Sequence, residues 1–137
     1  MTSTVVYQGD LRTECAHNAS GSTLITDAPV DNHGKGEAFS PTDMVATALA
    51  SCLLTVMGIK ARDMDVDLKG TKTTIEKVMA SGPRRIVKIN VNVYFKINPE
   101  EKIKKILEKT ALNCPVFFSL SETMEKNTQF FWSESAS

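Results

Sequence analysis

A long run without a strong helix breaker, Met44 to Arg62, constrains this chain more than any other feature. Its apolar and small side chains lie all round the predicted helix rather than along one stripe, and only Gly58 weakens it. Ser40 is a favourable N-cap residue before it, and Pro41 suits the first helical position. A helix with this profile must be buried on most sides, so we expect it at the centre of the fold.

Short extended runs precede this helix. Thr4 to Tyr7, Leu11 to Cys15 and Thr23 to Thr26 are separated by residues typical of turns, which predicts a small antiparallel meander.

Further strands are predicted after the helix. Asp65 to Thr73 and Thr74 to Ala80 contain β-branched residues in extended patterns, and Arg85 to Ile97 alternates polar with apolar residues. One apolar face of that last segment consists of Val87, Ile89, Val91, Val93 and Phe95. This alternation is the clearest half-buried strand in the chain.

The C-terminal part is predicted to contain a second helix, capped by Asn98, with an amphipathic pattern that ends before Cys114-Pro115. A short helix from Val116 to Met124 and a strand at Thr128 to Trp132 follow. The predicted order β-β-β-α-β-β-β-α-β is of the α+β class, and the length favours one domain, residues 1–137.

Composition excludes several classes of protein. Lys plus Arg (16) equals Asp plus Glu (16), so the basic surface of a nucleic-acid binder is not expected. No basic segment followed by an apolar run begins the chain, and polar residues interrupt Val45 to Ile59, so we expect neither a signal peptide nor a membrane span. We therefore predict a cytoplasmic protein whose three cysteines are reduced thiols.

Motifs for metals, phosphates and serine nucleophiles are missing. Neither Cys-x-x-Cys nor His-Glu-x-x-His spacing occurs, and Gly34-Lys35-Gly36 lacks the other elements of a phosphate-binding loop. No Gly-x-Ser-x-Gly motif is present. We predict no metal and no cofactor.

The cysteines are the remaining candidates for chemistry. Cys52 lies in the middle of the predicted helix, where a packed structural thiol is the simpler interpretation. Cys114 stands at a helix break, where a thiol can face a cleft or simply end the helix. Cys15, in a predicted strand, is a core or edge position.

A reactive thiol needs a nearby cation, because a free cysteine has a pKa of about 8.5 and is mostly protonated at neutral pH. Cys52 is too far from a helix N-terminus to be helped by it. We favour Arg12, on the second strand, over Arg62, Arg84 and Arg85, although an exposed strand charge explains Arg12 equally well.

Three segments together resemble one known family. They are Gly36 to Cys52 (GEAFSPTDMVATALASC), Leu112-Asn113-Cys114-Pro115 followed by Ser119-Leu120, and the opening Tyr7-Gln8-Gly9-Asp10-Leu11-Arg12. In this order, and on matching predicted elements, they resemble the OsmC/Ohr family of osmotically inducible and organic hydroperoxide resistance proteins.

The resemblance implies an intertwined homodimer in which antiparallel sheets wrap two long central helices. It also implies a cysteine peroxidase: Cys52 attacks an organic hydroperoxide, Cys114 condenses with the product to form a disulfide, and a dithiol reductant restores both thiols. We expect peroxide to join Cys52 to Cys114 and to leave Cys15 free.

One position departs from the family pattern. Strong peroxidases of the family carry a glutamate after the helix-starting proline, where it holds the catalytic arginine, whereas Thr42 stands here and the nearest acid is Asp43. We therefore expect a less firmly held arginine unless Asp43 reaches it, with Lys35 as another candidate cation. A dimer that binds small molecules or acyl chains without turnover, or that senses oxidation, is the alternative.

Overall fold

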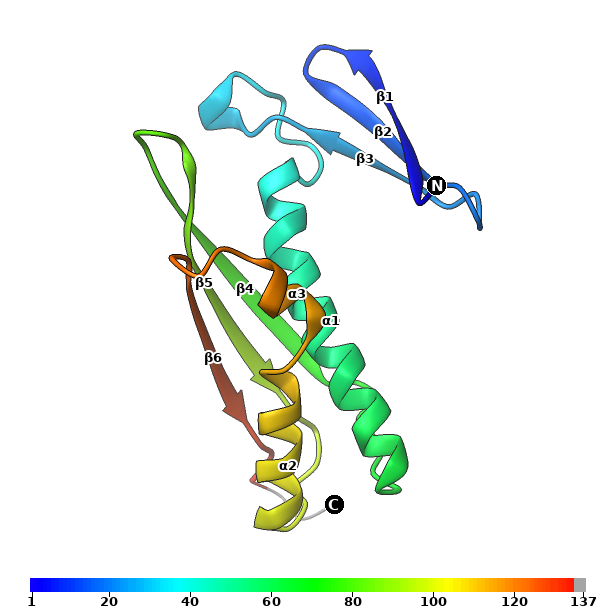
Figure 1. Cartoon of the computed structure of the whole chain (residues 1–137), viewed down its shortest axis with the longest axis vertical. Coiled ribbons are helices and arrows are strands. Elements are labelled where there is room, and N and C mark those ends of the chain that lie inside the picture. The colour runs from blue at the N-terminus through cyan, green and yellow to red at the C-terminus, as the bar shows by residue number, and fades with distance from the viewer. Residues whose placement is uncertain (135–137) are drawn as a thin grey trace. The chain divides into compact units, whose positions relative to one another are not determined.

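The computed structural model describes residues 1–134, which form two compact units, residues 1–45 and the remainder of the chain. Figure 1 labels the elements of both. In chain order they are β1 (Ser3–Gly9), β2 (Arg12–His17), β3 (Thr23–Asp27), the 3₁₀ helix η1 (Val30–Asn32), α1 (Pro41–Asp63), β4 (Lys72–Ala80), β5 (Arg85–Tyr94), α2 (Glu101–Ala111), α3 (Pro115–Ser119) and β6 (Glu125–Phe131). The α+β prediction is confirmed.

The first unit is the predicted meander. Strands β1, β2 and β3 pair in sequence order, each antiparallel to the next. Most of its apolar side chains are exposed, including those of Val5, Val6, Tyr7, Leu24 and Ile25. Its buried residues are polar: Thr26, Asp27 and Ser40.

The second unit contains the hydrophobic core. Sheet β4-β5-β6 turns one face inward, and the β5 residues Ile89, Val91 and Val93 are fully buried there, as their alternation predicts. Helices α1 and α2 pack on that face through Leu53, Met57 and Leu107 among others. Their buried side chains form one continuous cluster with the sheet.

One predicted pairing direction is wrong. The family resemblance implied antiparallel sheets, but β5 and β6 are parallel, because α2 and α3 carry the chain back to the start of β5 before β6 begins. Strand β4 is antiparallel to β5.

The predicted strand Asp65 to Thr73 is also wrong, since only its last two residues belong to β4. The chain turns sharply after α1: the Val66 amide donates to the Ala61 carbonyl, and Asp65 and Gly70 both have positive φ. Left-handed residues of this kind interrupt an extended chain, whatever its β-branched content.

Helix boundaries differ from the prediction at the second helix. Asn98 is not its cap; Glu100 occupies that position without a side-chain hydrogen bond. The short helix after Pro115 forms, but it ends at Ser119 instead of reaching Met124.

The buried face of α1 is narrower than the sequence predicts. Within the described chain its buried residues lie on one stripe: Ala46, Leu49, Ala50, Leu53, Met57 and Ala61. On the other faces Ala48, Ser51, Thr55 and Ile59 are exposed. By length and composition α1 is also the one described helix that could cross a membrane, a test that core helices pass as well.

Candidate functional site

The end of α2 determines the position of Cys114. The helix stops at Ala111, and Asn113 donates from its backbone to Thr110 and from its side chain to the Lys109 carbonyl. Cys114 itself is extended, with φ −81° and ψ 147°, as a residue before proline prefers. It is the N-cap of α3, and its Sγ accepts a hydrogen bond from the Phe117 amide at 3.3 Å.

The Cys114 thiol is completely buried, with an exposed fraction of 0%, rather than open to a cleft. Burial is the largest influence on it and raises the pKa of Cys114, and contact with Cys52 raises it further, while the Phe117 amide opposes both. A raised pKa keeps this sulfur protonated at neutral pH.

Cys52 lies in the middle of α1, between the buried residues Leu49 and Leu53 in sequence, and is itself partly exposed. It packs against the core cluster that contains Cys114 and lies near enough to raise the pKa of that thiol, and both are free thiols. Two elements far apart in sequence therefore bring the two predicted site cysteines together in the second unit.

Cys15 lies on β2 in the first unit, where its sulfur is 3.9 Å from the Thr13 hydroxyl.

Arg12 begins β2, and the register places it directly opposite Asp27 on β3. Its Nε donates to Asp27 Oδ1 at 2.7 Å and its Nη2 to Oδ2 at 2.9 Å, a bidentate pair. Glu37 adds a carboxylate 3.7 Å from Nη2. Arg12 is thus held in one orientation, and the expectation of a loosely held arginine is wrong.

Asp27 was not predicted as a functional residue. Only 1% of it is exposed, and it also accepts a hydrogen bond from the Glu37 amide at 3.1 Å. The hydrogen bonds from Arg12 are the largest influence and hold the pKa of Asp27 below its usual range, although burial alone would raise it. The same pair raises the pKa of Arg12. A buried charge needs a partner, but only the strand register identifies Arg12 as that partner.

Asp43 takes part in the start of α1. Its carboxylate accepts a hydrogen bond from the Ser40 amide at 3.0 Å, while the Ser40 hydroxyl accepts one from the Asp43 amide at 3.0 Å. This reciprocal arrangement is a capping box with aspartate in the acidic position. The Thr42 hydroxyl lies 3.3 Å from that of Ser40.

The other candidate cations lie elsewhere. Arg85 donates to the carbonyls of Ser81 and Pro83 at the turn before β5, and Lys35 and Arg84 are exposed.

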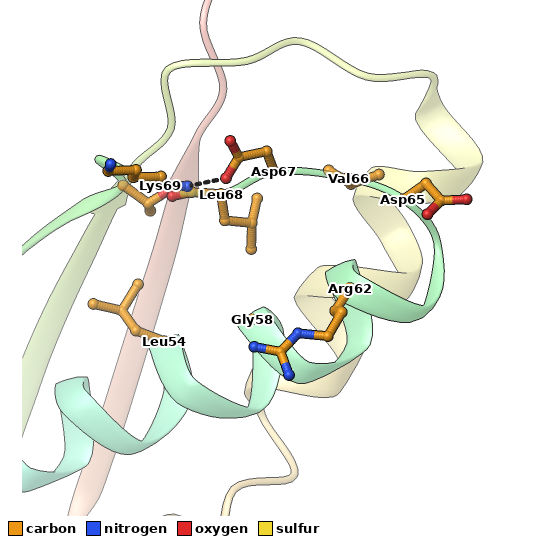
Figure 2. A pocket seen from close by; sticks show the side chains of 9 residues that line it. Leu54, Gly58, Arg62, Asp65, Val66, Asp67, Leu68 and Lys69 are labelled. Atoms are coloured by element: carbon orange, nitrogen blue, oxygen red, sulfur yellow. Dashed lines mark hydrogen bonds between the residues drawn. The ribbon is translucent and has the colours of Figure 1, made fainter.

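Arg62 lines a cavity of about 570 Å³ between the end of α1 and the following loop. Figure 2 shows its guanidinium beside Gly58, with Leu54 and Leu68 on the other walls. Neither Cys52 nor Cys114 lines this cavity, so we do not place the reaction there.

The sequence and the fold both resemble those of known proteins. A family model described as OsmC-like protein matches residues 34–128. No curated protein sequence matches the chain.

Several solved structures are similar. A protein of Psychrobacter arcticus 273-4, provisionally assigned to osmotic stress induction and the detoxification response, is 50% identical, with a TM-score of 0.90 over 97% of this chain and 96% of that chain. The organic hydroperoxide resistance protein OsmC of Legionella pneumophila is 15% identical, with a TM-score of 0.71 over 97% of each chain. An organic hydroperoxide resistance protein of Elizabethkingia anophelis, with thiocyanate bound, is 11% identical, with a TM-score of 0.76 over 97% of each chain. The last two similarities show the fold alone.

Proposed function

Because this chain belongs to the OsmC-like protein family, we propose that it reduces organic hydroperoxides with a pair of cysteines, Cys52 and Cys114. The observation that supports this most directly is that Cys52 packs against the core cluster containing Cys114 and lies near enough to raise the pKa of that thiol. A peroxidase of this kind needs one sulfur to attack the peroxide and a second within reach to close a disulfide.

The two cysteines have different roles. Cys52 is partly exposed, so a peroxide can reach it, whereas Cys114 is buried and its raised pKa keeps it protonated. Thiolates rather than thiols attack peroxides. We therefore assign the first attack to Cys52 and the second step to Cys114.

The chemistry balances in three steps. Cys52 sulfur bonds to one peroxide oxygen, the O–O bond breaks, and the thiol proton leaves with the other oxygen as an alcohol, so Cys52 becomes a sulfenic acid. Cys114 sulfur then attacks that sulfur, and the hydroxyl leaves as water with the Cys114 proton. A dithiol reductant reduces the disulfide by two thiol–disulfide exchanges and is itself oxidised to a disulfide.

Arg12 is the cation that we propose for the thiolate. Asp27 uses Nε and Nη2, so Nη1 makes no hydrogen bond within the described residues and is available to a developing negative charge. A guanidinium fixed in this way stabilises charge without reorganising during the reaction. Asp27 thus takes the arginine-holding role, and Asp43 is a positioning residue that fixes the start of the helix carrying Cys52.

A second copy of the chain completes the proposal. The first unit is a three-stranded sheet with exposed apolar side chains on both faces, and α1 exposes the faces opposite its buried stripe. A small sheet needs a hydrophobic partner to be stable. We infer a homodimer that covers these surfaces and works in the cytoplasm, where a dithiol can recycle it.

Peroxide turnover tests the function. We expect the protein to consume cumene hydroperoxide catalytically with dihydrolipoamide as reductant, and the Cys15→Ser variant to match it. Cys52→Ser should be inactive, and Cys114→Ser should be oxidised once without turnover. One stoichiometric oxidation of the unmodified protein would instead indicate a sensor, and unreacted Cys52 would indicate a binding protein.

A further inference from the structure

The outward face of sheet β4-β5-β6 is unusually rich in groups that form hydrogen bonds. Its residues lie in rows that run across the three strands. Side chains on one face recur at every second residue of a strand, so neighbouring rows are about 7 Å apart. The rows are Lys72–Tyr94–Phe131, Thr74–Asn92–Gln129, Glu76–Asn90–Asn127 and Val78–Lys88–Glu125. Asparagine is a poor strand former, so placing two on the central strand is not explained by strand stability.

The amides of this face form a groove of about 450 Å³. In one row the Asn127 amide donates to Asn90 Oδ1 at 3.1 Å, and Asn90 in turn donates to Glu76 Oε1 at 2.8 Å, which fixes both amides. In the neighbouring row Asn92 and Gln129 also line the groove, and their side chains make no hydrogen bond within the described residues. Each of these amides offers both donors and acceptors.

An exposed aromatic pair borders the groove. The rings of Tyr94 and Phe131 stack with centroids 5.2 Å apart and planes 14° apart, although 39% and 44% of these residues are exposed. Phe131 covers one face of the tyrosine ring. Tyr94 also lines a second cavity, of about 560 Å³, which shares Thr74 with the groove.

Two lysines give this second cavity a positive charge. Lys72 and Lys96 line it, no carboxylate does, and neither lysine forms an ion pair within the described residues. Lys96 lies across Gly70: a Cβ there would be 2.9 Å from Nζ, and φ of Gly70 is +91°. The positive φ is the requirement that favours glycine here, because the end of a lysine side chain can move away from an added Cβ.

We propose that this face binds an acidic carbohydrate, with its acid group between Lys72 and Lys96, a sugar ring against Tyr94, and hydroxyls on the row of Thr74, Asn92 and Gln129. An aromatic face contacts the apolar side of a sugar ring, and amides and a hydroxyl match its alcohols. Lysine ammonium groups bind carboxylates and phosphates as point charges. The site involves no cysteine and does not depend on the proposed peroxidase function.

Single-stranded nucleic acid, which also stacks on aromatic residues, fits this face less well. Such proteins neutralise many phosphates with a basic groove. Here Glu76 and Glu125 lie on the same face, and the chain as a whole has no net charge. Binding of an oligonucleotide is therefore an outcome that overturns the proposal.

The test follows the side-chain amide signals of ¹⁵N-labelled protein by NMR during titration with tetragalacturonate, glucose 6-phosphate, neutral maltotetraose or the oligonucleotide dT8. We expect either acidic sugar to shift the Asn92 and Gln129 amides, with affinity that falls as salt is added. Maltotetraose should bind at least tenfold more weakly. No shift with either acidic sugar, equal binding of the neutral sugar, or tighter binding of dT8 would each overturn the proposal.

Matched variants locate the site. The double variant Lys72→Ala/Lys96→Ala should weaken binding of the acidic sugar at least tenfold, and Asn92→Ala should weaken it severalfold. The control Lys102→Ala/Lys105→Ala removes two exposed lysines from α2 and should bind as the unmodified protein does. Equal loss in the control would show that only net charge matters and would contradict the proposed site. The four lysines are exposed and Asn92 is half-buried. Circular dichroism checks that each variant is folded.

Discussion

At the residue scale, the Arg12–Asp27 pair is the most informative contact. A buried carboxylate is unfavourable without a partner, and here the partner is a guanidinium whose two donors match its two oxygens. The pair fixes the arginine that we propose as the cation of the reaction. It also links folding to pH.

The pH dependence of stability follows from Asp27. Its pKa is lowered in the folded protein, so folding favours the ionised form. The resulting stabilisation is fully present above the ordinary aspartate pKa of about 4 and is lost as pH falls through the lower folded value. We expect acid to reduce the free energy of unfolding less steeply below pH 4 in Asp27→Asn, measured by urea unfolding at several pH values. Parallel curves for variant and unmodified protein would contradict this.

The rate of oxidation should depend on the same pair. We expect Arg12→Ala to slow oxidation of Cys52 by about tenfold or more, because one oriented donor typically contributes at least this much. Asp27→Asn should slow it less, since the arginine remains but is held by a neutral group. Stopped-flow peroxide consumption measures both rates, and Arg85→Ala is the matched control. An unchanged rate in Arg12→Ala would leave Lys35 as the next cation to replace.

At the element scale, a lysine from β6 contacts α3 and the turn that follows it. Lys126 of β6 donates to the carbonyls of Ser121 and Met124 at 3.1 Å each, and its ammonium lies 5.0 Å from the centre of the Phe117 ring. The Phe117 amide in turn donates to Cys114. The strand therefore helps to position the cap that carries the second cysteine.

Replacing Lys126 should affect the second step of the reaction alone. We expect Lys126→Met to slow disulfide formation severalfold while Cys52 is oxidised at its usual rate, because the loss of two hydrogen bonds and a cation–π contact loosens α3. Lys126→Arg should restore part of the rate. Mass spectrometry of quenched samples separates sulfenic acid from disulfide, and equal slowing of both steps would indicate a general loss of structure.

The start of α1 can be tested separately from chemistry. Ser40→Ala removes the hydroxyl that caps the Asp43 amide and should lower the free energy of unfolding by about 1 kcal/mol. Asp43→Ala should cost a similar amount, with little change in oxidation rate if its role is to position the helix. Chemical denaturation and peroxide kinetics together check this. A large rate loss at unchanged stability would assign Asp43 a direct part in the reaction.

At the scale of the whole molecule, the described chain leaves apolar surface uncovered. The exposed faces of α1 carry small residues, Ala48, Ser51 and Thr55, which allow another element to approach closely. Together with the exposed meander, this surface is what a second copy would bury.

A large charged side chain on α1 should separate the two copies. We expect the unmodified protein to sediment as a dimer at low micromolar concentration, and Ala48→Arg to shift it toward a monomer of lower stability. Lys105→Arg, on exposed α2 surface, is the control. A folded monomer for the unmodified protein would exclude the homodimer.

Much of the fold follows from the sequence because its causes are local. The alternation along β5, the cap at Ser40 and the break before Pro115 each depend on neighbouring residues, and each lies where predicted. The missing strand after α1 shows where such local reasoning fails. There, positive φ at Asp65 and Gly70 overrides the β-branched pattern.

The sequence could predict which residues take part in the chemistry, but not how they are arranged in space. The sequence motifs indicated Cys52, Cys114 and Arg12, yet nothing local could show that Cys114 is buried or that Asp27 holds Arg12. Both depend on strand register and on the packing of elements distant in sequence. Such contacts arise only when the tertiary structure brings separate elements together. The tertiary structure alone therefore decided which carboxylate pairs with the arginine and which sulfur is buried.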